Sequence, residues 1–192
     1  MYNSLDLFLK SQINKYESQI LIQINKCLSK QIMITRRQNS RFSIMVAGPK
    51  GSGKSSFFNS IIGKEIVKNE NSNEINIYML NLECNGINQK ISLIDTPGFG
   101  ESFNDNSLQE SIITYIKEQY DLFIMEENKI RRNSKYEDTR VHCLLYFIPS
   151  TSGGLKHNDI AFLRKISHLT NIIPVISKAD GLTSIETERM KK

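Results

Sequence analysis

Residues 42–55 read FSIMVAGPKGSGKS, and this stretch decides the fold. Its first six residues are mostly apolar and predict a buried strand, and a helix is expected over 54–63. Between them, Gly48 to Ser55 fit the pattern G-x-x-x-x-G-K-[ST], in which a glycine-rich loop joins a strand to a helix. Backbone amides converge at such a helix start, so the stretch predicts a phosphate-binding loop.

Individual residues of this loop have distinct expected roles. Lys54 is expected to reach the terminal phosphates, and the hydroxyl of Ser55 to bind magnesium. The alternative, a merely flexible glycine-serine loop, is disfavoured because a chance match is expected in roughly 1% of chains of this length. The residues expected to contact nucleotide here are Gly48, Gly51, Ser52, Gly53, Lys54, Ser55 and Ser56.

Two later motifs extend the prediction to a guanine nucleotide. Asp95 ends a predicted strand and begins the run DTPG, so its carboxylate is expected to hold magnesium and the amide of Gly98 to approach a third phosphate. Further on, Lys178 and Asp180 stand in the run SKAD after another buried strand. A carboxylate there can accept paired hydrogen bonds from guanine, which adenine cannot donate. The ordered motifs predict that GTP or GDP binds with magnesium.

Apolar runs and helical patterns alternate along the rest of the chain. This order predicts the α/β class, with a mostly parallel sheet, helices on both faces and the architecture of a P-loop NTPase. Asn85-Gly86 indicates a hairpin, so the strand at 75–82 is expected to be antiparallel, and the polar segment 126–140 is expected to be a solvated loop. Further strands are expected at 90–95, 141–148 and 171–176, and helices at 107–125 and 158–168.

The N-terminal region, 1–41, is separate from the rest in its charge. It carries seven basic and two acidic side chains, which accounts for the whole net charge of +5, and apolar residues repeat at helical spacing over 4–33. We interpret this region as a basic amphipathic helix with a polybasic end. Packing on the domain or on a second copy is favoured about twofold over a membrane-lying helix, because Asn and Gln fill much of the polar face. Its charge suits anionic lipid, nucleic acid or an acidic partner.

Membrane-spanning and secreted classes are disfavoured. No apolar run approaches the roughly 18 to 20 residues of a membrane span, and the N-terminus lacks the features of a signal peptide. Cys27, Cys84 and Cys143 are widely spaced and form no CxxC pair. They predict reduced thiols in an intracellular protein, with neither a disulfide framework nor a zinc site.

Longer runs around these motifs are more specific than the motifs themselves. They are FSIMV before the loop, DTPGFG at 95–100, DTRVHCLLYFI at 138–148, GLK at 154–156 with Asp159-Ile160, and NIIPVISKAD at 171–180. Through these runs the sequence over 42–192 resembles the septin family rather than GTPases in general. The resemblance implies a septin-type G domain over 42–192, incomplete at its C-terminal end, after an N-terminal region of 1–41.

The resemblance also implies a cellular role. Septins are cytoskeletal GTP-binding proteins that assemble into hetero-oligomers and filaments in cell division and at the cell cortex. We therefore expect a cytoplasmic, cytoskeletal location at the cortex or division site, and other septin subunits or a second copy as partners through the G domain, rather than nucleic acid. In the family a basic stretch before the loop binds phosphoinositides, and the matching residues here are Lys30, Arg36, Arg37 and Arg41.

Departures from the family pattern bear on catalysis and assembly. No threonine lies between Ser55 and Asp95, so Ser72 is the candidate catalytic residue and GTP hydrolysis is expected to be slow or absent. Gly153 stands where the family usually has an interface histidine, and the sequence ends at Lys192, soon after Asp180. The alternatives are a soluble regulatory GTPase switch and a degenerate scaffold that binds no nucleotide. A switch with fast hydrolysis is disfavoured because no glutamine follows Gly98.

Overall fold

The computed structural model describes residues 41–63, 65, 67, 74–84, 87–100, 105–133, 135–150 and 155–190. It forms two compact units, one ending at Lys178 and the other including the chain from Ala179 onward. The first unit holds the sheet and the phosphate-binding loop. The helix predicted over 4–33 lies outside the described residues, and the domain boundary between residues 41 and 42 stays a prediction.

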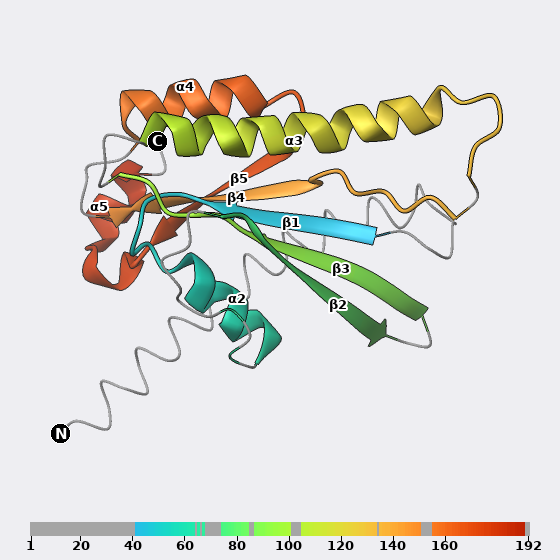
Figure 1. Ribbon diagram of the computed structural model, residues 1–192. Coiled ribbons are helices and arrows are strands. Elements are labelled where there is room, and N and C mark those ends of the chain that lie inside the picture. The colour runs from blue at the N-terminus through green and yellow to red at the C-terminus, as the bar shows by residue number, and fades with distance from the viewer. Residues whose placement is uncertain are drawn as a thin grey trace. The chain divides into compact units, whose positions relative to one another are not determined.

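A five-stranded sheet forms the centre of the first unit, with the strand order β2-β3-β1-β4-β5 (Figure 1). β1, β3, β4 and β5 run parallel, whereas β2 pairs antiparallel with β3, with Asn76 opposite Asp95. The prediction of a mostly parallel sheet is therefore confirmed, and so is the prediction that the strand at 75–82 is antiparallel. The strands are β1 (Arg41–Ala47), β2 (Asn76–Cys84), β3 (Ile87–Asp95), β4 (Cys143–Pro149) and β5 (Asn171–Ser177).

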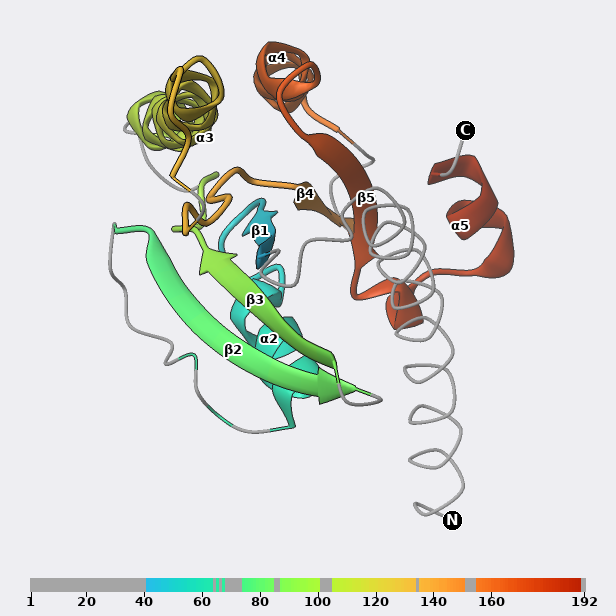
Figure 2. The same ribbon diagram turned by 90° about the vertical axis from the view of Figure 1, so that its right-hand side faces the viewer.

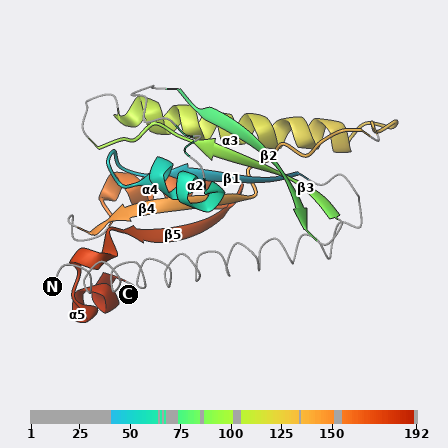
Figure 3. The same ribbon diagram turned by 90° about the horizontal axis from the view of Figure 1, so that it is seen from below.

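Helices cover both faces of this sheet, as the fold class requires. Helix α2 (Lys54–Ile62) lies on one face, and α3 (Asp105–Glu127) and α4 (His157–Ile166) lie on the other (Figures 1 and 2). Seen from below, α2 crosses the face formed around β1 (Figure 3). The second unit contains a 3-10 turn, η2 (Ala179–Gly181), and helix α5 (Ser184–Met190).

The central strands are buried on both faces, which explains their continuous apolar sequence. Every residue of 42–47 in β1 and of 143–148 in β4 is buried. On the α2 face, the rings of Phe57 and Phe147 meet edge to face with centroids 5.6 Å apart. Among the residues that the structure describes, no helix combines the length and apolar character needed to cross a bilayer.

The segment predicted as a solvated loop over 126–140 is only partly so. Glu126 belongs to α3, is buried, and accepts hydrogen bonds from Lys129 Nζ at 2.7 Å and from the amide of Asn133 at 2.8 Å. Further along, the guanidinium carbon of Arg140 lies 3.4 Å from the ring centroid of Phe123 in α3. Glu126 thus continues α3 and Arg140 packs on that helix, so the prediction was wrong at the two ends of the segment.

Candidate nucleotide-binding site

The glycines of the phosphate-binding loop adopt conformations that other residues would resist. Gly51 and Gly53 have φ values of 71° and 85°, in the left-handed region. At Gly48 a Cβ atom would lie 2.6 Å from the carbonyl oxygen of Phe147 in β4. The loop therefore turns tightly against the neighbouring strand as it passes from β1 to α2.

The start of α2 presents unpaired backbone donors to this loop. Its first helical bond runs from the amide of Phe57 to the carbonyl of Gly53 at 2.9 Å. The amides of 53–56 precede that bond, and no described backbone carbonyl accepts from them. Together with the helix dipole, these donors form a site suited to an anion such as a phosphate group.

Lys54 lies inside the loop rather than in solvent. Its ammonium donates to the carbonyls of Gly48 at 3.0 Å and Pro49 at 2.8 Å, and the residue is 6% exposed. Burial lowers the pKa of Lys54 to about 8, although the nearby charge of Asp95 opposes the shift. The ammonium is thus held at the loop with much of its hydration removed, and an arriving phosphate would stabilise its charge.

Ser55 and Asp95, which are each predicted to hold magnesium, lie in contact. The hydroxyl of Ser55 donates to Asp95 Oδ2 at 2.9 Å, across 40 residues of chain. Burial raises the pKa of Asp95, against the hydrogen bond from Ser55 and the charge of Lys54. The second carboxylate oxygen, Oδ1, is buried without a partner.

These two side chains fit a magnesium ion because one buried oxygen of Asp95 is unsatisfied and the Ser55 hydroxyl lies beside the other. Within the described ranges, no cluster of three or more His, Cys, Asp or Glu side chains could hold a metal by itself. Phosphate oxygens and water usually supply the remaining ligands of magnesium at nucleotides.

The segment after Asp95 lies directly on the loop. A Cβ atom on Gly98 would come within 2.5 Å of Lys50 Cα, so only glycine fits. Phe99 continues this contact through its backbone, and the amide of Lys50 donates to its carbonyl at 2.9 Å. Thr96 and Phe99 were not among the residues predicted to form the site, although both lie within the DTPGFG run that carries the family resemblance.

The residues expected to recognise guanine divide between the two units. Lys178 ends the first unit as an exposed residue with a φ of 52°, in the left-handed region. Asp180 lies in η2 of the second unit and is also exposed. Of the other predicted residues, Ser52 is buried with its hydroxyl donating to Pro49 O at 2.7 Å, and Ser56 is exposed in the first turn of α2.

Several predicted residues fall elsewhere. Ser72 and Gly153 lie outside the described residues, as do Lys30, Arg36 and Arg37. Arg41 is described, and it is bound into the domain: its Nε donates to Ser92 Oγ at 2.5 Å, and its side chain is 11% exposed. It is therefore a poor member of an exposed basic cluster.

Comparison with known proteins places this geometry in context. A family model described as Septin matches residues 38–192. The chain is 68% identical over 160 residues to cell division control protein 11 of Encephalitozoon cuniculi, covering 83% of this chain and 60% of that protein. It is 35% identical over 181 residues to human septin-9, covering 89% of this chain and 31% of that protein. The chain thus spans less than two thirds of the length of these curated relatives.

Solved structures show the same fold. The crystal structure of Cdc11 from Saccharomyces cerevisiae superposes with a TM-score of 0.58 at 36% sequence identity, covering 79% of this chain and 58% of that one. A septin GTPase domain from Chlamydomonas reinhardtii gives a TM-score of 0.59 at 21% identity, covering 78% of this chain and 56% of that one, and supports the fold alone. The sequence-based prediction of family and fold is confirmed.

Proposed function

Because this chain belongs to the septin family, we propose that it is a guanine nucleotide-binding cytoskeletal subunit that assembles with other septins in cell division. Nucleotide would mainly shape an assembly interface, with slow or absent turnover. The observation that carries this proposal is the loop itself, where unpaired amides, the Lys54 ammonium and the Ser55-Asp95 pair converge.

Each of these groups has a defined task in nucleotide binding. The amides at the start of α2 would surround the phosphates, and Lys54 would exchange its two carbonyl partners for phosphate oxygens. Ser55 and Asp95 would hold magnesium, which neutralises phosphate charge. Lys178 and Asp180 are proposed to contact guanine, with Asp180 accepting from its ring nitrogen and amino group.

Slow or absent hydrolysis is supported by the residue that follows Gly98. Switch GTPases place a glutamine there to orient water, whereas Phe99 here is 3% exposed with its ring in the core. Ser72 is the proposed catalytic residue for any residual hydrolysis, because no threonine lies between Ser55 and Asp95.

The names of the relatives support a proposal for assembly and location. The proteins similar to this chain are named cell division control proteins 10 and 11 and septins 3 and 9, so we propose septin subunits or a second copy as partners, and a cytoskeletal place at the division site or cortex. Contact with anionic lipid is proposed through Lys30, Arg36 and Arg37, since Arg41 is engaged within the domain.

Lys54→Ala tests nucleotide binding directly. The substitution removes the ammonium, so GTP affinity measured by calorimetry with magnesium should fall at least 100-fold, while the circular dichroism spectrum stays that of the parent. Unchanged GTP affinity in a folded Lys54→Ala sample would contradict the assignment of Lys54.

ATP should compete poorly with GTP for the parent protein. Equal competition by ATP would contradict the proposed role of Asp180. Single-turnover hydrolysis at about 10⁻³ per second or faster, the range of switch GTPases without an activating protein, would favour a switch GTPase instead.

A further inference from the structure

Gly98 is held between two anchors that belong to its neighbours in the chain. On one side, the hydroxyl of Thr96 donates to the carbonyl of Val46 at 2.8 Å in the core, which ties it to the end of β1. On the other side, Phe99 bonds to the phosphate-binding loop. Only Pro97 and Gly98 lie between these anchors, and the ring of Pro97 fixes its own φ.

The Phe99 anchor is a short piece of parallel sheet. Phe99 bridges to Pro49; its carbonyl accepts from the amide of Lys50 at 2.9 Å and its amide donates to Gly48 O at 3.4 Å. The amide of Lys50 is thereby used inside the protein, so the donors free for phosphate begin beyond it. Gly98 consequently rests against Lys50, with no room for a side chain.

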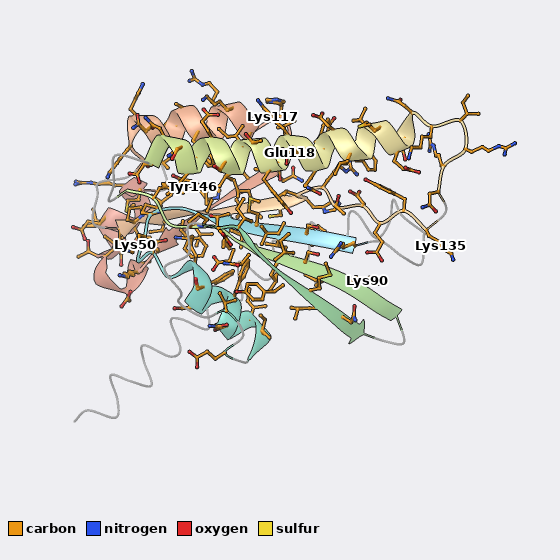
Figure 4. All side chains as sticks on the ribbon, in the orientation of Figure 1. Lys50, Lys90, Lys117, Glu118, Lys135 and Tyr146 are labelled. Atoms are coloured by element: carbon orange, nitrogen blue, oxygen red, sulfur yellow. The ribbon has the colours of Figure 1, made fainter. Side chains whose placement is uncertain are left out.

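A cluster of three rings holds Phe99 in place from the other side. Its ring centroid lies 6.2 Å from that of Tyr146 in β4 and 5.9 Å from that of Phe162 in α4, and these two lie 6.0 Å apart. Each of the three residues is at most 3% exposed. Tyr146 pairs in register with Ala47, the last residue before the loop, so its ring lies at the same end of the sheet as Lys50 (Figure 4).

We propose that Phe99 is a positioning residue that sets the preference for nucleoside triphosphate over diphosphate. Through its ring it holds Gly98 against the loop, where the Gly98 amide meets a third phosphate but nothing of a diphosphate. Tyr146 and Phe162 act through Phe99 in the same way. The inference rests on the proposed nucleotide binding and adds to it the residues that distinguish a nucleoside triphosphate from a diphosphate.

Phe99→Leu tests this, because leucine keeps an apolar side chain but fills the ring cluster poorly. Dissociation constants of the full chain with magnesium are measured for GDP and for a GTP analogue that resists hydrolysis. We expect the analogue to bind about tenfold more weakly, and GDP to change by less than twofold. Phe162→Leu should shift the ratio in the same direction, although Phe162 lies in α4, far along the chain from Phe99.

Phe42→Leu is the matched control. Phe42 is equally buried at 3% and stacks on His142, but it lies at the start of β1, away from the loop. The Phe42→Leu substitution should lower the melting temperature about as much as Phe99→Leu does. It should leave the ratio of the dissociation constants for the GTP analogue and GDP unchanged. An unchanged ratio in Phe99→Leu, or an equal change in Phe42→Leu, would overturn the inference. A parent that binds neither nucleotide would instead overturn the proposed function on which it rests.

Discussion

At the scale of single residues, Lys54 illustrates a conflict between stability and binding. Its ammonium is almost fully buried with two carbonyl partners, and burial lowers its pKa to about 8. An apolar residue would avoid this desolvation. The charge is useful only when phosphate is present, so the loop keeps an unfavourable group for the sake of its ligand.

The lowered pKa predicts how GTP binding depends on pH. Phosphate favours the charged ammonium, so above pH 8 the free chain must first take up a proton at Lys54 before it binds. Affinity should therefore fall about tenfold between pH 7 and pH 9. Calorimetry in buffers of different ionisation enthalpy should show the matching proton uptake at pH 9.

Lys54→Arg is the control for this pH effect, because a guanidinium stays charged throughout the range. The variant should bind GTP more weakly, since the wider group fits the loop poorly, but its affinity should not change from pH 7 to pH 9. A flat profile for the parent, or the same fall in both proteins, would show that Lys54 is not the titrating group.

Residue chemistry was predictable where motif spacing carried it, and not where packing did. The contact of Ser55 with Asp95 follows from a loop at one strand end and a carboxylate at the next, since β1 and β3 are parallel neighbours. The proposed role of Phe99 could not be predicted from motif spacing, because the burial of Phe99 depends on a helix that begins at His157. The sequence in between does not specify where that helix packs.

At the scale of elements, the chain entering β4 is tied to the start of β1 by a small polar network. Nδ1 of His142 accepts from the amide of Ser43 at 3.1 Å, which leaves Nε2 as the donor to Asp138 Oδ2 at 3.3 Å. Asp138 also accepts from Arg140 Nη2 at 2.7 Å, and Arg140 lies over Phe123. Asp138 thus connects two strands and a helix.

Asp138→Asn should destabilise the domain through this network. Burial alone would raise the pKa of Asp138, but hydrogen bonds from His142 and Arg140 hold it well below its ordinary value. Loss of the charge should lower the free energy of unfolding by about 1 to 3 kcal/mol at pH 7, measured by urea titration. A depressed pKa stabilises the folded state above the unfolded value near 4, so the difference from the parent should narrow as pH falls below about 4.

Glu137→Gln provides the comparison, because Glu137 is the adjacent residue and pairs with Lys90 and Arg41 at a more exposed site. Surface ion pairs contribute little, so this change should cost less than about 1 kcal/mol at pH 7. If Glu137→Gln costs as much as Asp138→Asn, the partly buried network around Asp138 has no special part in joining the strands.

Elements were most predictable where burial made their sequence uniform. The runs in β1 and β4 are apolar throughout because helices cover both faces. The predicted strand at 141–148 instead begins at Cys143, since Val141 and His142 belong to the entering chain. His142 binds both backbone groups of Ser43, one through its ring and one through its amide, and such long-range pairing leaves no periodic signal in the sequence.

At the scale of the whole molecule, the distribution of charge separates two regions. The net charge of +5 resides entirely in the N-terminal region, 1–41, whereas basic and acidic side chains are equal in number over 42–192. Within the described part of 42–192 several of these charges are paired, among them Lys90 with Glu137 and Lys165 with Glu110. A long-range attraction to an anionic surface would therefore come from the N-terminal region.

Replacing Arg36 and Arg37 with Ala should weaken binding to phosphoinositide-containing vesicles. Each charge near an anionic surface contributes about 1 kcal/mol, so the double variant should bind roughly 30-fold more weakly at physiological salt in a sedimentation assay. The matched control is Arg131→Ala with Lys135→Ala, which removes two exposed charges after α3 and should bind as the parent does. Higher salt should reduce the difference, because screening shortens the reach of the charges. Equal losses in both double variants would mean that net charge, rather than the segment before β1, governs membrane contact.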